Sequence, residues 1–253
     1  MSDVVSVPDR KSFSKKAPDV RRQELIDATF RCLCDRGVFE TSVRTIASEA
    51  GLSLGMVRHH FNSKDELLAA TYRNMSERLK EQTQELLART PPDSMSQLVA
   101  FINAGLQPPL LDRNYVRIRF LFFELTHTNK VVKRVHEEIY ARFEQQLLAL
   151  VTAVARDHGS KADCRMVTRT ITTYLKGIWA EWTLSSDDFE PRELLAQMMS
   201  FWLGMLAPDV VPAQMPIDRP AGVDKRVTAG SKRKPAAKKA AAPSRRTRTA
   251  SPA

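Results

Sequence analysis

The segment TSVRTIASEAGLSLGMVRHHF, residues 41–61, carries more structural information than any other part of the chain. It predicts two short helices joined by a tight turn. Ala47 is small enough for the second helix to cross the first closely, and Gly51, four residues later, can take the positive φ that the turn needs. Val57 is a branched apolar side chain that can pack into the angle between the helices. The spacing predicts a helix-turn-helix, whose second helix begins at Leu54 and can enter the major groove of DNA.

This segment resembles the N-terminal DNA-binding domain of the TetR family of bacterial one-component regulators. The resemblance is dense from about residue 21 to residue 79 and rests on Thr41, Ser42, Ile46, Ala47, Ala50, Gly51, Ser53, Gly55, Phe61, Lys64, Leu67 and Leu68. An ordinary pair of helices in a helical enzyme or adaptor is the alternative interpretation. The resemblance implies a homodimer that binds double-stranded operator DNA and responds to a small-molecule effector. Repression is the expected sign of regulation.

The remaining sequence predicts an all-α protein of about nine helices. Apolar residues recur at helical spacing and no alternating strand pattern repeats. The expected helices cover residues 20–36, 43–50, 54–61, 64–89, 94–105, 113–127, 130–154, 162–185 and 192–206. Ser63 with Glu66 has the pattern of a capping box at the start of the fourth helix. We expect an arm at 1–17, a helix-turn-helix domain at 18–64, a helical ligand-binding and dimerisation domain at 65–207 and a tail at 208–253.

The net charge of +10 is concentrated in the expected tail. Residues 208–253 contain eleven Lys or Arg and three Asp, a net charge of +8, so the rest of the chain carries +2. Few large apolar residues lie there, and we expect the tail to be disordered. It can hold the protein near nucleic-acid phosphates, or it can be a solvated extension without a function. A nonspecific, nucleoid-type protein driven by this tail is the alternative function.

Other classes of protein have weaker support in the sequence. The 253 residues contain no apolar run of the roughly 18 residues that span a bilayer. The three cysteines, Cys32, Cys34 and Cys164, have neither a disulfide nor a metal-ligand spacing, which favours a reduced cytoplasmic location. A DNA-binding protein is expected to be associated with the nucleoid there. No HExxH, GxSxG or glycine-rich phosphate loop occurs. We therefore expect no enzyme activity, no cofactor and no metal.

The expected DNA contacts lie at the helix starts and along the second helix of the motif. They are Thr41, Ser42, Arg44, Ser53, Leu54, Gly55, Met56, Arg58, His59, His60 and Lys64. Arg58 is the best candidate for a guanine edge, because arginine can donate two parallel hydrogen bonds to it. Arg44 can reach a phosphate or a base. The short hydroxyls, the two histidines and Lys64 suit phosphate oxygens.

The C-terminal half resembles the betaine-synthesis repressor subgroup of the same family more weakly, with Tyr174, Gly177 and Trp179 as its best marks. The resemblance implies a choline-like effector, and aromatic faces beside a carboxylate suit such a cation. The candidate pocket residues are Phe120, Phe123, Glu124, Tyr174, Trp179 and Trp182. The alternative is that these aromatics are core, with Glu124 and Glu181 in solvent. Lys176 argues against a cationic ligand, so the effector stays open.

The last expected helix is apolar around most of its circumference. Such a helix must be covered on two sides, and its own core covers only one. The family resemblance likewise implies dimers formed through the last two long helices. The candidate interface residues are Trp179, Met198, Phe201, Trp202 and Met205.

Overall fold

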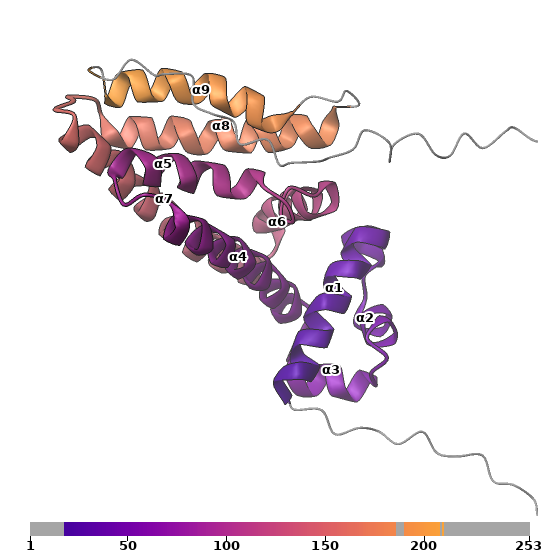
Figure 1. Ribbon diagram of the computed structural model, residues 1–253. Helices are drawn as coiled ribbons and strands as arrows, with labels where there is room; N and C mark the ends of the chain where they lie inside the picture. The colour runs from indigo at the N-terminus through magenta and orange to yellow at the C-terminus, as the bar shows by residue number, and fades with distance from the viewer. Residues whose placement is uncertain (1–17, 186–189, 208, 210–253) are drawn as a thin grey trace, which may run out of the picture. The chain divides into compact units, whose positions relative to one another are not determined.

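The computed structural model describes residues 18–185, 190–207 and 209. Within these residues it contains nine α-helices, one 3₁₀ turn and no strand, so the all-α prediction is confirmed (Figure 1). The helices are α1 (Pro18–Glu40), α2 (Val43–Glu49), α3 (Leu54–His60), α4 (Lys64–Arg89), α5 (Ser94–Asn103), α6 (Arg113–Thr128), α7 (Lys130–Asp157), α8 (Cys164–Leu184) and α9 (Pro191–Leu206), with the 3₁₀ turn η1 (Ala104–Leu106) after α5. The expected arm at 1–17 and, apart from Asp209, the expected tail at 208–253 lie outside the described residues.

Short polar residues define where the helices begin. The Ser42 hydroxyl accepts from the Thr45 amide and the Thr45 hydroxyl accepts from the Ser42 amide, so α2 starts with a reciprocal capping box. At α4 the box that we predicted is only half present. The Ser63 hydroxyl accepts from the Glu66 amide at 3.1 Å, but the Glu66 carboxylate accepts from the backbone and side-chain amides of Asn62 instead. Asn62 offers that carboxylate two donors, whereas Ser63 would offer one.

Gly37 interrupts α1 near its end. Its φ of 71° is left-handed, as expected of the glycine that stops this helix, but one further helical stretch reaches Glu40. Thr41 ties this stretch down, because its hydroxyl donates to the Gly37 carbonyl at 2.6 Å.

The helix-turn-helix is built as its sequence predicts. Gly51 has a φ of 64°, which a residue with a side chain adopts only at a cost. Ile46, Ala47 and Val57 are buried together with side chains of α1 in a small apolar cluster. The inner face of α3 is therefore fixed by packing, and Arg58 and His59 of the same helix are exposed.

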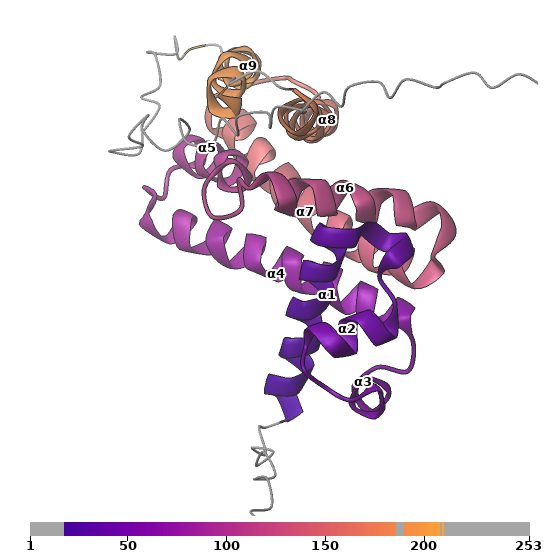
Figure 2. The same cartoon turned by 90° about the vertical axis from the view of Figure 1, so that its right-hand side faces the viewer.

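Helix α4 connects this small cluster with the C-terminal helices. Its N-terminal residues Leu67 and Ala70 belong to the helix-turn-helix cluster. Tyr72 and Met75, one turn further, pack with residues of α1, α6 and α7. A third cluster joins α5, α6, α7, α8 and α9, and the last two helices lie side by side (Figures 1 and 2). The proposed domain boundary at residue 64 stays a prediction, because α4 belongs to the core on both sides of it.

Candidate DNA-binding surface and effector cavity

Helix α3 presents a short polar face opposite its buried side. Ser53, Gly55, Arg58 and His59 are exposed, while Leu54 and Met56 are half-buried and Val57 points into the core. Ser53 caps the helix by accepting from the Met56 amide at 3.3 Å. Because a cap uses only the oxygen lone pairs, the hydroxyl proton stays available to a phosphate. Exposed Ser42 caps α2 in the same way, and its hydroxyl is also hydrogen-bonded to the Thr45 hydroxyl at 3.3 Å.

Arg58 and Arg44 are exposed on the two helices of the motif. Among the described residues neither side chain has a hydrogen bond or an ion pair to another part of the chain. Their guanidinium groups are thus available to a partner outside the chain, which is what a base-reading or phosphate-binding arginine needs. Their roles on DNA stay predictions.

One predicted phosphate contact is wrong. Thr41 is fully buried and its hydroxyl donates inward to Gly37, so it fastens α1 and cannot reach a phosphate. The Nε2 atom of His60 is buried and has no hydrogen-bond partner among the described residues. Burial, and then the nearby His59 and Arg22, lower the pKa of His60, which disfavours its charged form. One ring nitrogen of His60 is thus shielded from solvent, whereas His59 is exposed, and a phosphate contact by either histidine stays a prediction.

Lys64 lies at the N-terminus of α4, where a phosphate would meet both its charge and the helix dipole. Its ammonium donates to the Val38 carbonyl at 3.1 Å. This bond uses one of three ammonium protons and holds the side chain at the end of α1. A phosphate contact by Lys64 stays a prediction.

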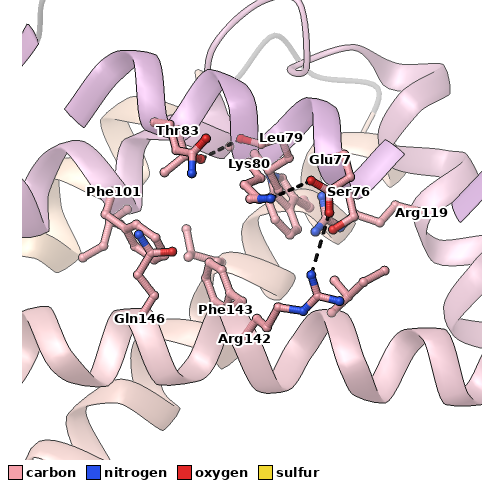
Figure 3. A pocket seen from close by; sticks show the side chains of 16 residues that line it. Ser76, Glu77, Leu79, Lys80, Thr83, Phe101, Arg119, Arg142, Phe143 and Gln146 are labelled. Atoms are coloured by element: carbon pink, nitrogen blue, oxygen red, sulfur yellow. Dashed lines mark hydrogen bonds and ion pairs between the residues drawn. The ribbon is translucent and has the colours of Figure 1, made fainter. Parts of the chain in front are cut away.

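A cavity of about 100 Å³ lies among α4, α5, α6, α7 and α8. Its apolar walls include Leu79, Phe101, Ile102, Phe143, Leu175 and Trp179, and its polar lining includes Glu77, Lys80, Arg119, Arg142 and Gln146. Figure 3 shows Glu77, Arg119 and Arg142 near one end and Phe101 with Gln146 near the other. An adjoining recess adds Tyr140, Thr172 and Lys176. Concave, mostly apolar sites with a few polar groups are the usual form of a small-molecule site.

Of the six residues predicted to form the pocket, only Trp179 lines this cavity. Phe120 and Phe123 pack edge to face with each other, and Phe123 also meets His136 and Tyr140. Tyr174 packs on Trp202 and donates to the Leu194 carbonyl, and Trp182 lies under the Arg113 guanidinium. Glu124 and Glu181 are exposed. The structure thus does not gather these six residues around one cavity, because packing turns side chains that share a helical stripe toward different neighbours. Their part in effector binding stays a prediction.

Arg119 is the cavity residue that sequence reasoning missed. It is only 8% exposed, and its guanidinium carbon lies 4.6 Å from the centre of the Trp179 ring. Its Nε has no hydrogen-bond partner among the described residues. Burial lowers its pKa, but the hydroxyls of Tyr140, Tyr115 and Tyr72 outweigh burial and leave the pKa raised. A single arginine inside the apolar run Ile118–Phe123 was the sequence signal.

The predicted dimer residues also divide into two groups. Trp179 and Trp202 are 6% and 2% exposed within the single chain, so neither can form an interface surface. Met198 is half-buried against the core. Phe201 and Met205 are 60% and 38% exposed, and Met205 lines a surface hollow together with exposed Met166 of α8. The exposed apolar surface of α8 and α9 therefore includes Met166, Phe201 and Met205, whereas the two tryptophans belong to the core of the single chain.

Other kinds of site lack support in the described part of the chain. No group of three His, Cys, Asp or Glu side chains there could hold a metal ion. All three cysteines are free, and burial raises the pKa of Cys32 and Cys34. None of the described helices is long and apolar enough to cross a membrane.

Comparisons with known proteins match both halves of this arrangement. Residues 25–71 match the family of bacterial regulatory proteins called tetR, and residues 94–207 match the C-terminal region of BetI-type transcriptional repressors. The HTH-type transcriptional regulator BetI of Stenotrophomonas maltophilia is 27% identical over 183 residues, which are 71% of this chain and 89% of that protein.

Solved structures agree on the fold. A transcriptional regulator from Pseudomonas aeruginosa PAO1 superposes with a TM-score of 0.69 at 28% identity, over 76% of this chain and 93% of its own. A regulator from Saccharomonospora viridis, solved in complex with choline, gives a TM-score of 0.64 at 18% identity, over 73% of this chain and 96% of its own. At that identity the second likeness concerns the fold alone.

Proposed function

Because the chain belongs to the TetR family of bacterial transcriptional regulators, and is thus a DNA-binding regulator and not an enzyme, we propose that it is a repressor released by a small molecule. In this proposal a homodimer binds a pseudo-palindromic operator in the cytoplasm. The effector binds in the cavity of the C-terminal helices and lowers the affinity for the operator.

The observation that supports this proposal best is the course of α4. Its first turns pack into the helix-turn-helix cluster through Leu67 and Ala70. Its later turns form one wall of the cavity through Leu79, Lys80 and Thr83. One uninterrupted helix thus joins the DNA-reading part to the effector site, and a shift at one end is carried to the other.

We expect α3 to enter the major groove, with Arg58 on a base edge and Arg44 on a base or a phosphate. The expected phosphate contacts are made by Ser42, Ser53, His59 and Lys64. Leu54, Gly55 and Met56 complete the face that approaches the groove. A two-fold dimer would present two such helices to successive major grooves, with half-sites roughly 34–36 Å apart or somewhat more. The exposed Phe201, Met205 and Met166 support a dimer formed through α8 and α9.

The test is binding of the purified protein to the DNA immediately upstream of its own gene. We would measure it at two salt concentrations with random duplex as competitor, for the full chain and for a chain that ends at Ala207. Tight binding that resists the competitor in both forms is the expected result. Loss of binding with the tail, or equal competition by random DNA, would contradict a specific regulator of this operator.

A further inference from the structure

The cavity contains a buried positive charge that the chain leaves without a carboxylate. Arg119 has no ion pair among the described residues, and its Nε is buried without a partner. Burying a charge costs several kcal/mol unless it is paired and hydrogen-bonded. Two explanations are therefore possible: the charge binds a group that enters the cavity, or neutral neighbours stabilise it.

The neutral neighbours do not complete the shell of Arg119. The Trp179 ring covers one face of the guanidinium, and Tyr140 is hydrogen-bonded to it. Burial raises the pKa of Tyr140, so this hydroxyl is neutral at ordinary pH and brings no negative charge. The positive charge of Arg119 is therefore stabilised in part but not neutralised.

The surrounding charges increase the excess. The cavity and its recess are lined by four cationic side chains, Lys80, Arg119, Arg142 and Lys176, and by a single carboxylate, Glu77. Glu77 already pairs with Lys80 at 2.8 Å and Arg142 at 3.8 Å, as Figure 3 shows. Lys176 lies over the Tyr140 ring at 4.4 Å, and burial followed by the repulsion from Arg119 lowers its pKa. Glu144 opposes this effect from outside the lining.

Much of the remaining lining of the cavity is apolar. The apolar side chains in the lining are Leu79, Phe101, Ile102, Phe143 and Leu175. Figure 3 shows Phe101 at the end away from Glu77, Arg119 and Arg142. Such walls gain from contact with a hydrocarbon or aryl group and offer few partners to a polar one.

We propose that the effector is a small organic monocarboxylate with an apolar body, whose carboxylate pairs with the guanidinium of Arg119. A planar guanidinium matches a carboxylate with two parallel hydrogen bonds, and the incoming charge would neutralise the cationic end of the cavity. A quaternary ammonium ion such as choline would meet Arg119 and Lys176 as like charges and is not expected to bind. This inference rests on the proposed function, because it assigns the class of effector to that same cavity.

The first experiment is isothermal titration calorimetry of the full-length protein with octanoate and phenylbutyrate as probes. Octanamide and choline serve as the uncharged and oppositely charged comparisons. Both carboxylates are expected to bind, while octanamide and choline do not bind measurably. Binding of choline in preference to the carboxylates, or binding of neither carboxylate, would overturn the proposal.

The second experiment assigns the binding to Arg119. Arg119→Met keeps much of the side-chain volume and removes the charge, and Arg134→Met makes the same change at an exposed site of α7 outside the cavity. Carboxylate binding is expected to weaken about tenfold to hundredfold in the first variant and to stay unchanged in the second. Should Arg119→Met fail to fold, Arg119→Lys decides, since it keeps the charge but loses the planar fork and is expected to weaken binding. Unchanged binding in the folded Arg119 variant would overturn the proposal.

Release of operator DNA separates this inference from the proposed function. Carboxylates that bind through Arg119 without releasing DNA would leave the ligand class standing and contradict ligand-released repression. Release of the operator by choline, with no binding of carboxylates, would support ligand-released repression and contradict the carboxylate as effector.

Discussion

Arg117 on α6 donates a hydrogen bond from its guanidinium to the backbone carbonyl of Cys34 on α1. Two residues further along α6, Arg119 lines the proposed effector cavity. The helix that carries the proposed effector anchor thus also holds the first helix of the DNA-binding part. This is a second connection between the two sites, in addition to the continuous helix α4.

Arg117→Ala should therefore weaken the coupling between the two sites. We expect operator affinity and carboxylate affinity, measured separately, to change little, while the coupling free energy between them falls by about 0.5–2 kcal/mol. The measurement is operator affinity by fluorescence anisotropy with and without saturating carboxylate. Arg113→Ala, on the same helix but facing Trp182 and Ser185, is the control. An undiminished coupling would remove α6 from the pathway.

Arg58→Ala should reduce sequence discrimination. The lost base contact is expected to cost about 1–3 kcal/mol on the operator and much less on random duplex. Competition binding with both duplexes measures the difference, with exposed Arg165→Ala on α8 as a control for the loss of one positive charge. Equal losses on the two duplexes would assign Arg58 to the phosphate backbone instead.

Lys64→Ala should weaken all DNA binding to a similar extent. Without this ammonium, DNA binding would release about one counterion fewer, so the slope of log affinity against log salt should fall by about 1. Lys64→Arg keeps the positive charge, so it shows whether a loss of affinity comes from the charge or from the altered hydrogen bond to the Val38 carbonyl. A salt slope unchanged in Lys64→Ala would leave this lysine only its structural bond to α1.

Gly51→Ala should destabilise the protein through its backbone alone. An added Cβ at Gly51 meets no atom within 4 Å, but its φ of 64° is left-handed, which costs a residue with a side chain about 1–2 kcal/mol. Gly55→Ala is the matched control, because its Cβ would meet only Ser53 Oγ at an ordinary 3.7 Å. Urea unfolding of the DNA-free protein measures both. Equal stability of the two variants would contradict the assigned turn geometry.

Phe201→Glu should dissociate the proposed dimer without unfolding the chain. The side chain is 60% exposed in the single chain, so a carboxylate there is tolerated by the monomer but would be desolvated in an interface. Sedimentation velocity measures the oligomeric state, and Gln145→Glu, which adds a carboxylate at an exposed position of α7, is the control. A variant that sediments as the unaltered protein does would place the interface elsewhere.

Much of the fold could be predicted because its signals are local. The helix predicted for residues 113–127 is observed at Arg113–Thr128, and the ones predicted for 54–61 and 192–206 differ from α3 and α9 by one residue. Caps such as Ser42 and Ser53 satisfy backbone groups within three residues, and Gly51 is required by its own φ. None of these features needs a distant partner to be recognised.

The candidate sites were predicted less evenly. Arg44 and Arg58 are exposed, as expected from the amphipathic pattern of a two-helix motif. Thr41 had the right chemistry on the same motif, but its hydroxyl donates to the Gly37 carbonyl of α1 and is turned inward. The motif alone could not predict this direction, because it depends on how α1 packs against the start of α2.

The sequence by itself determined the helices, the turn at Gly51 and the membership of a DNA-binding family, since these depend on spacing over a few residues. Tertiary structure alone decided that Trp179 and Trp202 are core, that Phe201 is surface and that Arg119 is a buried cation at a cavity. A helical stripe in the sequence shows only which side chains point to the same side of a helix. What lies in that direction depends on how α4, α6, α7 and α8 pack together, and this packing sets the charge of the groups that line the cavity.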